Sequence, residues 1–77
     1  MNNKERFDKI VKEVFQLEHI DENMTRENTE NWDSMMHLMF VSAIEDEFDV
    51  MLDSEDILNL NTYQDGLKIV EKYSLEM

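Results

Sequence analysis

The chain contains no proline and a single glycine in 77 residues, and this scarcity strongly limits what it can fold into. Folds rich in β-strands and loops need many residues that accept tight turns, whereas helix interiors exclude proline and disfavour glycine. Cysteine is also absent, so neither a disulfide framework nor a thiolate metal site is available. The sequence therefore predicts an all-α fold that forms one small domain over residues 1–77.

Apolar residues recur at helical spacing over about residues 3–17, which predicts a first amphipathic helix. A long polar loop follows, in which Ile20 and Met24 are the residues expected to turn inward. A second helix begins at Asp33 or Ser34, either of which is a good N-cap. The residues expected on its inner face are His37, Phe40, Val41, Ile44 and Phe48.

Two further helices are predicted in the second half of the chain. A short third helix covers about residues 54–59, and Asp53 or Ser54 can cap it. Thr62 caps a fourth helix that runs to about Tyr73, within which Gly66 indicates close packing against another helix, because glycine is a poor helix former. Each helix has one apolar face, so the four are expected to pack as a small four-helix bundle with a long first loop.

The net charge of −12, from 19 acidic and 7 basic residues, excludes several kinds of partner. Such a chain repels nucleic acid and anionic lipid, and it attracts basic protein surfaces. Eleven acids and no lysine or arginine lie between Glu27 and Leu67. No apolar run is long enough for a membrane span, and the first residues lack the apolar region of a signal peptide. We therefore expect a monomeric cytoplasmic protein.

Ser34 is open to three interpretations. It can simply cap the helix, although Asp33 can cap the same helix and leave the hydroxyl free. It can accept a phosphorylated group, because free backbone N–H groups and the positive end of the helix dipole favour a phosphate there. It can also be a nucleophile with His37 as base and Asp33 as orienting group. A small helical domain has little room for a cleft and an oxyanion hole, so no enzyme is expected.

A family resemblance is carried by the segment that contains Ser34. The sequence reads Asp33-Ser34-Met35, then Leu38, Val41 and Ile44, then Glu45-Asp46-Glu47-Phe48, and further on Leu52-Asp53-Ser54-Glu55-Asp56. These residues resemble the Asp-Ser-Leu helix of acyl carrier proteins, and the resemblance spans essentially the whole chain. It implies that the Ser34 hydroxyl accepts 4′-phosphopantetheine from coenzyme A through a phosphopantetheinyl transferase. Acyl or aminoacyl groups would then be held on this arm as thioesters and delivered to partner enzymes.

Departures from the family pattern narrow the expected pathway. Residues 30–32 replace the Leu-Gly pair that commonly precedes the Asp-Ser, and Met36 and Met39 stand where fatty-acid carriers usually have acidic residues. With His37 three residues after the serine, the segment is similar to stand-alone carriers of specialised pathways. Such pathways include polysaccharide modification and secondary metabolism, beside fatty acid synthesis itself.

The second helix also carries a candidate partner-binding face. Its inner face is already filled, so some of Met35, Met36 and Met39 must be exposed, and flexible methionines suit docking to several enzymes. The acidic part of the face consists of Glu45, Asp46 and Glu47. These acids oppose the helix dipole, and they would complement basic patches on the transferase and on acyl- or aminoacyl-loading enzymes.

Trp32 and His37 lie close to Ser34, and each has two interpretations. Trp32 packs over the first loop and shapes the approach to Ser34, or it contacts partner proteins. His37 is expected to be half-buried and bonded to the first loop or to a backbone carbonyl. Alternatively, His37 steadies the phosphodiester of the arm and forms the cofactor site together with Asp33 and Ser34.

By the same resemblance, a carried acyl chain slips between the second, third and fourth helices. The residues that would line this space are Ile44, Leu52, Ile57, Leu60 and Ile69. All five are equally compatible with a plain hydrophobic core.

One alternative comes from a different function class. An acidic helical interaction module without a prosthetic group explains the charge equally well, but it does not explain a serine at the start of the most acidic helix. The acids from Asp49 to Asp56 lack the glycine and the spacing of a calcium loop, so no metal site is expected.

Overall fold

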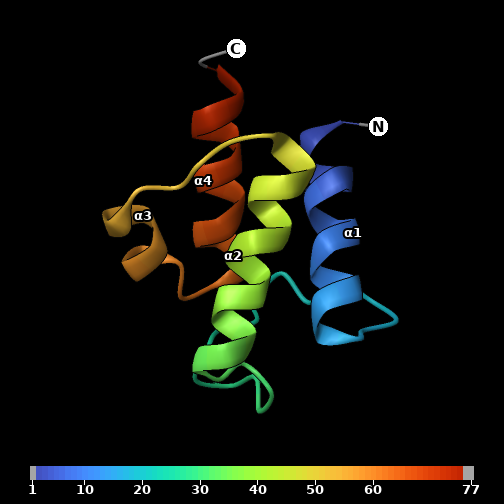
Figure 1. Ribbon diagram of the computed structural model, residues 1–77. Helices are drawn as coiled ribbons and strands as arrows, with labels where there is room; N and C mark the ends of the chain where they lie inside the picture. Colours follow the sequence, from blue (N-terminus) through green and yellow to red (C-terminus); the bar gives the residue numbers. More distant parts are fainter. Residues whose placement is uncertain (1, 76–77) are drawn as a thin grey trace.

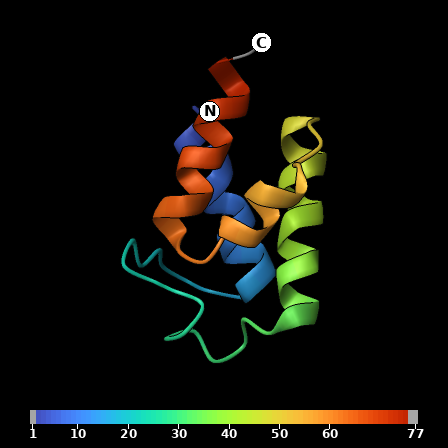
Figure 2. The same ribbon diagram turned by 90° about the vertical axis from the view of Figure 1, so that its left-hand side faces the viewer.

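Four helices make up the regular structure in the computed structural model, which describes residues 2–75. They are α1 (Asn3–Phe15), α2 (Ser34–Phe48), α3 (Ser54–Asn59) and α4 (Tyr63–Leu75). The all-α prediction is confirmed for this part of the chain, where no strand occurs beyond one isolated β-bridge. The long helices lie side by side, with α1 running opposite to α2 and α4, while short α3 lies to one side (Figure 1, Figure 2).

Polar side chains fix the start of each helix. The side chains of Asn2, Asp33 and Asp53 accept hydrogen bonds from backbone N–H groups in the first turns of α1, α2 and α3. Thr62 does the same for α4, where its hydroxyl accepts from the Asp65 N–H at 2.9 Å. These contacts satisfy N–H groups that have no partner inside a helix. Thr62 is confirmed as a cap, and α2 is capped by the aspartate rather than the serine.

Left-handed residues end the first two helices. Gln16 has φ 57° and its N–H donates to the Lys12 carbonyl, so α1 ends two residues earlier than predicted. Asp49 has φ 53° and its N–H donates to the Glu45 carbonyl at the end of α2. A single left-handed residue turns the chain out of the helix while it bonds one of the last free carbonyls.

An aromatic cluster occupies the centre of the core. The Phe7 ring lies 5.9 Å from that of Phe40 and 5.2 Å from that of Tyr63, and Phe15 meets Phe40 edge to face at 5.2 Å. All five residues predicted for the inner face of α2 are buried. Because α1 packs against both α2 and α4, this cluster joins the three long helices.

Gly66 of α4 packs against the Phe7 side chain of α1. A Cβ atom added at this position would be 2.5 Å from the Phe7 Cζ atom and 3.1 Å from the Leu60 Cδ1 atom. Even a single methyl group would force the Phe7 ring to shift, so the close packing predicted from this glycine is confirmed.

The first loop is fixed at its middle to the start of α4. Thr25 and Thr62 form an antiparallel β-bridge, in which the Tyr63 N–H donates to the Met24 carbonyl at 3.0 Å. The Arg26 N–H donates to the Asn61 carbonyl at 2.7 Å. Met24 is buried and Ile20 packs against the core, as predicted. The loop therefore has a fixed course beside the helices.

Helix α3 is attached to α4 through a buried carboxylate. Asp56 accepts two hydrogen bonds from Lys72 Nζ, at 2.9 and 3.0 Å, and one from the Tyr73 hydroxyl at 2.7 Å. The Lys72 ammonium and the Tyr73 hydroxyl hold the pKa of Asp56 below its ordinary value, because both stabilise the charged form. A helix of only six residues is thus held in place by polar contacts as well as by packing.

Candidate functional site

Ser34 is the first residue of α2, and its side chain is exposed. The capping role is taken by Asp33, whose Oδ1 atom accepts a hydrogen bond from the Met36 N–H at 2.8 Å. Within residues 2–75, the Ser34 hydroxyl takes part in no hydrogen bond. The first N–H groups of a helix point out of its N-terminus, so a group on this hydroxyl would lie against the positive end of the α2 dipole.

His37 is held by hydrogen bonds at both ring nitrogens, and only 7% of its surface is exposed. Its Nδ1 atom accepts from the Trp32 indole N–H at 3.0 Å, and its Nε2–H donates to the Ile57 carbonyl at 2.9 Å. This arrangement requires the neutral ring with its proton on Nε2. The expected bond to a backbone carbonyl is thus present, on α3, and the indole supplies the contact to the first loop.

These bonds leave neither ring nitrogen of His37 available to another group in this conformation. The hydroxyl of Ser34 is not bonded to the imidazole, so a nucleophile–base pair is not assembled here. A phosphodiester on Ser34 would likewise meet a histidine whose nitrogens already bond within the fold. His37 therefore joins the first loop, α2 and α3 in this structure, and its contact with the arm remains a prediction.

Of the two interpretations of Trp32, the structure supports internal packing and not an exposed contact with partners. Only 4% of its surface is exposed, because the indole packs against Phe15 at 5.1 Å and Phe40 at 5.6 Å between ring centroids. Its indole N–H also donates a hydrogen bond inside the protein, to His37. The aromatic partners lie on two different helices, and this convergence is not visible in the sequence.

Two of the three acids predicted to face partners are engaged within the fold. The Glu45 carboxylate accepts from the Leu52 N–H at 2.9 Å and so fixes the turn after α2. Glu47 pairs with the Arg6 guanidinium of α1 at 3.0 Å, and the same guanidinium donates to the Glu47 carbonyl. Only Asp46 is exposed without a polar partner in residues 2–75. The acidic part of the face is therefore smaller than the sequence suggested.

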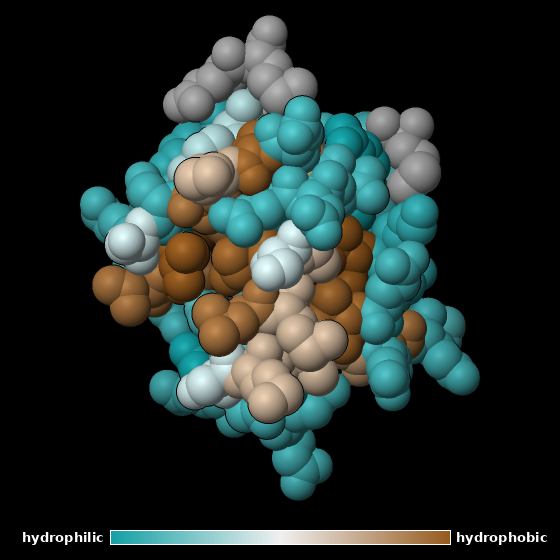
Figure 3. Space-filling view, in the orientation of Figure 1, coloured by the Kyte–Doolittle hydropathy of each residue, from teal (hydrophilic) through white to brown (hydrophobic). Residues whose placement is uncertain are grey.

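Apolar side chains are exposed on the outer face of α2, beside Ser34. Met35 and Met39 are 73% and 54% exposed, whereas Met36 is half-buried against the core. Leu38, which was not predicted for this face, is also largely exposed. A helical wheel places Leu38 outside the inner face of α2, and this position could have predicted its exposure. Figure 3 shows apolar atoms gathered over α2 and toward α3, with hydrophilic residues around them.

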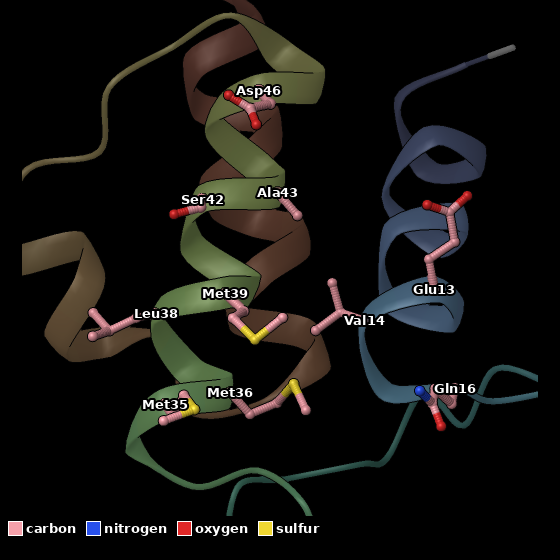
Figure 4. Close-up of a pocket in the computed structure, with 10 residues that line it drawn as sticks. All are labelled: Glu13, Val14, Gln16, Met35, Met36, Leu38, Met39, Ser42, Ala43 and Asp46. Atoms are coloured by element: carbon pink, nitrogen blue, oxygen red, sulfur yellow. The ribbon is translucent and has the colours of Figure 1, made fainter.

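An open groove runs along this face between α1 and α2. It has a volume of about 610 Å³ and is lined by residues of both helices. Figure 4 shows Val14 of α1 pointing toward the methionines of α2, with Glu13 and Asp46 further along the groove. The groove begins one residue after Ser34, at Met35.

The predicted acyl-chain residues all lie in or against the packed core. Ile44, Leu52, Leu60 and Ile69 are buried, and Ile57 packs against them while half-buried. An acyl chain placed among them would have to separate α2 from α3 and α4. Their role as a pocket remains a prediction.

Comparison of the sequence with protein-family models and with curated proteins finds no match. Among the described residues, no helix combines the length and apolar character needed to cross a membrane. In the same part of the chain, the His, Asp and Glu side chains form no cluster suited to hold a metal ion.

Proposed function

We propose that this chain is a stand-alone acyl or aminoacyl carrier protein, with the small four-helix bundle of that family and 4′-phosphopantetheine attached to Ser34. One observation carries the proposal. Asp33 caps α2, so the neighbouring serine hydroxyl is exposed and unbonded at the start of a 15-residue helix. Because Asp33 satisfies the cap of α2, the Ser34 hydroxyl is free for another role. The proposal includes a monomeric protein that acts in the cytoplasm.

The surroundings of Ser34 fit the proposed group. A phosphodiester on an exposed first-turn hydroxyl remains in water and near the positive end of the dipole, and both favour its negative charge. Asp33 keeps the first turn of α2 in place while the serine is modified. The thiol at the end of the arm, when present, supplies the atom that holds an acyl or aminoacyl group as a thioester. Catalysis would then belong to partner enzymes.

The exposed side chains of α2 supply the recognition in this proposal. Met35, Leu38 and Met39 offer an apolar, adaptable surface close to the attachment point, and Asp46 offers a carboxylate for a basic patch. The transferase and the loading enzymes must all approach Ser34 from this side. A flexible methionine surface suits several partners better than a rigid one.

The chain provides its own control for the modification test. Asp53-Ser54 repeats the Asp-Ser pair at the start of α3, with the same aspartate cap and an exposed serine. We would incubate the folded protein with coenzyme A and a broad-specificity phosphopantetheinyl transferase and measure the intact mass. The expected result is one added phosphopantetheine that disappears in Ser34→Ala and persists in Ser54→Ala. Modification that survives Ser34→Ala, or no modification by the cognate transferase, would refute the proposal.

A second test concerns the acidic residue that the fold leaves free. Asp46→Lys should slow the initial rate of modification, because it reverses the charge that a basic transferase would meet. Glu71→Lys makes the same change at an exposed position on α4, away from the α2 face. The two variants should retain equal helicity by circular dichroism. Equal rates for both would remove Asp46 from transferase recognition.

The acidic interaction module without a prosthetic group is the second candidate. It is favoured by the exposed apolar side chains of α2, which can bind a protein whether or not Ser34 is modified. Under this alternative Ser34→Ala would leave every function of the chain intact. The mass measurement separates the two candidates directly.

A further inference from the structure

His37 holds two segments of the chain on α2 at the same time. Its Nδ1 atom accepts from the indole N–H of Trp32, at the end of the first loop and just before Ser34. Its Nε2–H donates to the carbonyl of Ile57 in α3. Within α3 only Asp56 is buried, so polar contacts carry much of the attachment of this short helix. One imidazole thus closes both the first loop and α3 onto α2.

Both bonds exist together only while the imidazole of His37 is neutral. A second proton would sit on Nδ1, and an N–H would then face the indole N–H of Trp32 with 3.0 Å between the two nitrogens. Two donors cannot bond each other, so this contact would be lost. The charged ring would also lie where only 7% of its surface is exposed, and burial of an unpaired charge is costly. Uptake of the proton therefore favours a conformation in which the ring has left this site.

The charged groups around His37 are engaged with other partners. No ion pair in residues 2–75 includes the imidazole. The carboxylates next in sequence to its two bonding partners are Asp33, which caps α2, and Asp56, which is bonded to α4. The buried side chains described for α1 and α4 are apolar or aromatic, and the Tyr63 hydroxyl donates to Asp8. None of these groups is placed to offset a positive charge on the ring.

Release of His37 would leave the rest of the fold in place. The aromatic contacts of Phe7 and Phe40 join the long helices without it. Helix α3 would keep its bond to Lys72 of α4, because the lowered pKa of Asp56 keeps that carboxylate charged well below neutral pH. A helix of six residues is not stable alone, so α3 would move about this remaining contact.

We propose that His37 is a pH-sensitive latch. Its neutral ring closes Trp32 and α3 onto α2, and its protonation releases both while the three long helices stay packed. An imidazole in water takes up its second proton at about pH 6.5, so mild acid is enough to bias the latch. Because Trp32 lies just before Ser34, the open state loosens the segment that carries the Ser34 hydroxyl. The proposal holds whether or not Ser34 is modified, so it stands apart from the proposed function.

The chain contains its own reporter for this test, because Trp32 is the only tryptophan. The emission spectrum and its quenching by acrylamide would be followed in the full chain from about pH 8 to about pH 5. We expect a reversible red shift of the emission and a larger quenching constant in acid, as the indole gains access to solvent. A fall in intensity without a shift would show that the protonated ring stays in place, and it would overturn the proposal.

The two histidines provide matched variants. His37→Gln keeps one acceptor and one donor but cannot take up a proton, so its emission maximum should not change with pH. His19→Gln makes the same change at the other histidine, which is exposed, and should keep the response of the unmodified sequence. Circular dichroism would confirm that both variants are folded. An equal red shift in His37→Gln would overturn the proposal.

Hydrogen exchange followed by mass spectrometry gives a second readout that needs no variant. After correction for the intrinsic exchange rate, protection should fall between about pH 7.5 and pH 5.5 in residues 29–33 and 54–60 and stay constant in α1. Acid also reduces the net charge of −12 and its self-repulsion, and this general effect would raise protection instead. Unchanged protection in the two segments, or an equal loss in α1, would overturn the proposal. Neither result would affect the mass measurement at Ser34.

Discussion

The hydrogen bond between Trp32 and His37 makes a quantitative prediction about stability. Trp32→Phe keeps an aromatic ring near Phe15 and Phe40 but removes the N–H, so the buried Nδ1 atom of His37 loses its donor. A buried acceptor without a partner costs about 1–3 kcal/mol, and the smaller ring adds about 1 kcal/mol. A chain of 77 residues has a free energy of unfolding of about 4–12 kcal/mol. We therefore expect a loss of about 2–4 kcal/mol, a large share of that total.

A double-mutant cycle isolates the bond itself. His37→Leu leaves the Trp32 N–H unpaired, whereas the Ile57 carbonyl retains its 3.4 Å contact with the Leu60 N–H. In the double variant both members of the pair are gone, so its loss should fall short of the summed single losses by about 1–3 kcal/mol. Urea unfolding followed by far-UV circular dichroism measures all four proteins, since fluorescence loses its tryptophan. Additive losses, within about 0.3 kcal/mol, would show that the two side chains are not coupled.

Three further predictions address other parts of the fold. Gly66→Ala should lower the free energy of unfolding by about 1–2 kcal/mol, because overpacking against Phe7 outweighs the gain in helix propensity; a stabilised variant in urea unfolding would contradict the close approach. The lowered pKa of Asp56 means that the folded state favours the charged carboxylate. The stabilisation of the folded state that follows is present above about pH 4 and is lost as the pH falls further. Urea titrations of Asp56→Asn should therefore show a shallower decline of the free energy of unfolding between about pH 5 and pH 3. An unchanged decline would show that the Asp56 carboxylate does not contribute to the pH dependence of stability. Glu45→Gln should cost about 1 kcal/mol through the weakened bond to the Leu52 N–H, whereas Glu55→Gln, at an exposed position, should cost almost nothing by the same assay.

Much of the helical framework could be predicted from local signals. Asp33, Asp53 and Thr62 are capping residues that act within a few positions along the chain, so the sequence contains both members of each contact. The inner face of α2 follows from the 3.6-residue period alone. The end of α1 was misplaced because a left-handed Gln16 has no sequence signature as strong as glycine would give.

The candidate site was harder to predict because its contacts join distant segments. Nothing near Glu47 in the sequence indicates that Arg6 neutralises it, since 41 residues separate the pair. The burial of Trp32 likewise depends on how Phe15 of α1 packs beside α2. Exposure of Met35 could be predicted, because it needs only the helical wheel and a core stripe that is already full. The helical period therefore predicts which side chains are exposed, but it does not predict which charged side chains lack an ion-pair partner.

The β-bridge between Thr25 and Thr62 has a consequence for how the chain tolerates insertions. It divides the first loop into two short connections with a common fixed point, instead of one long flexible segment. Added residues in the second connection would lengthen it without touching the bridge, at the cost of the local turn bonds beside the insertion and a small cost in loop entropy. The same insertion beside Thr25 would pull apart the backbone bonds that join the loop to α4. Length changes in the connection that leads into Ser34 would therefore alter access to its hydroxyl while the bridge to α4 stays in place.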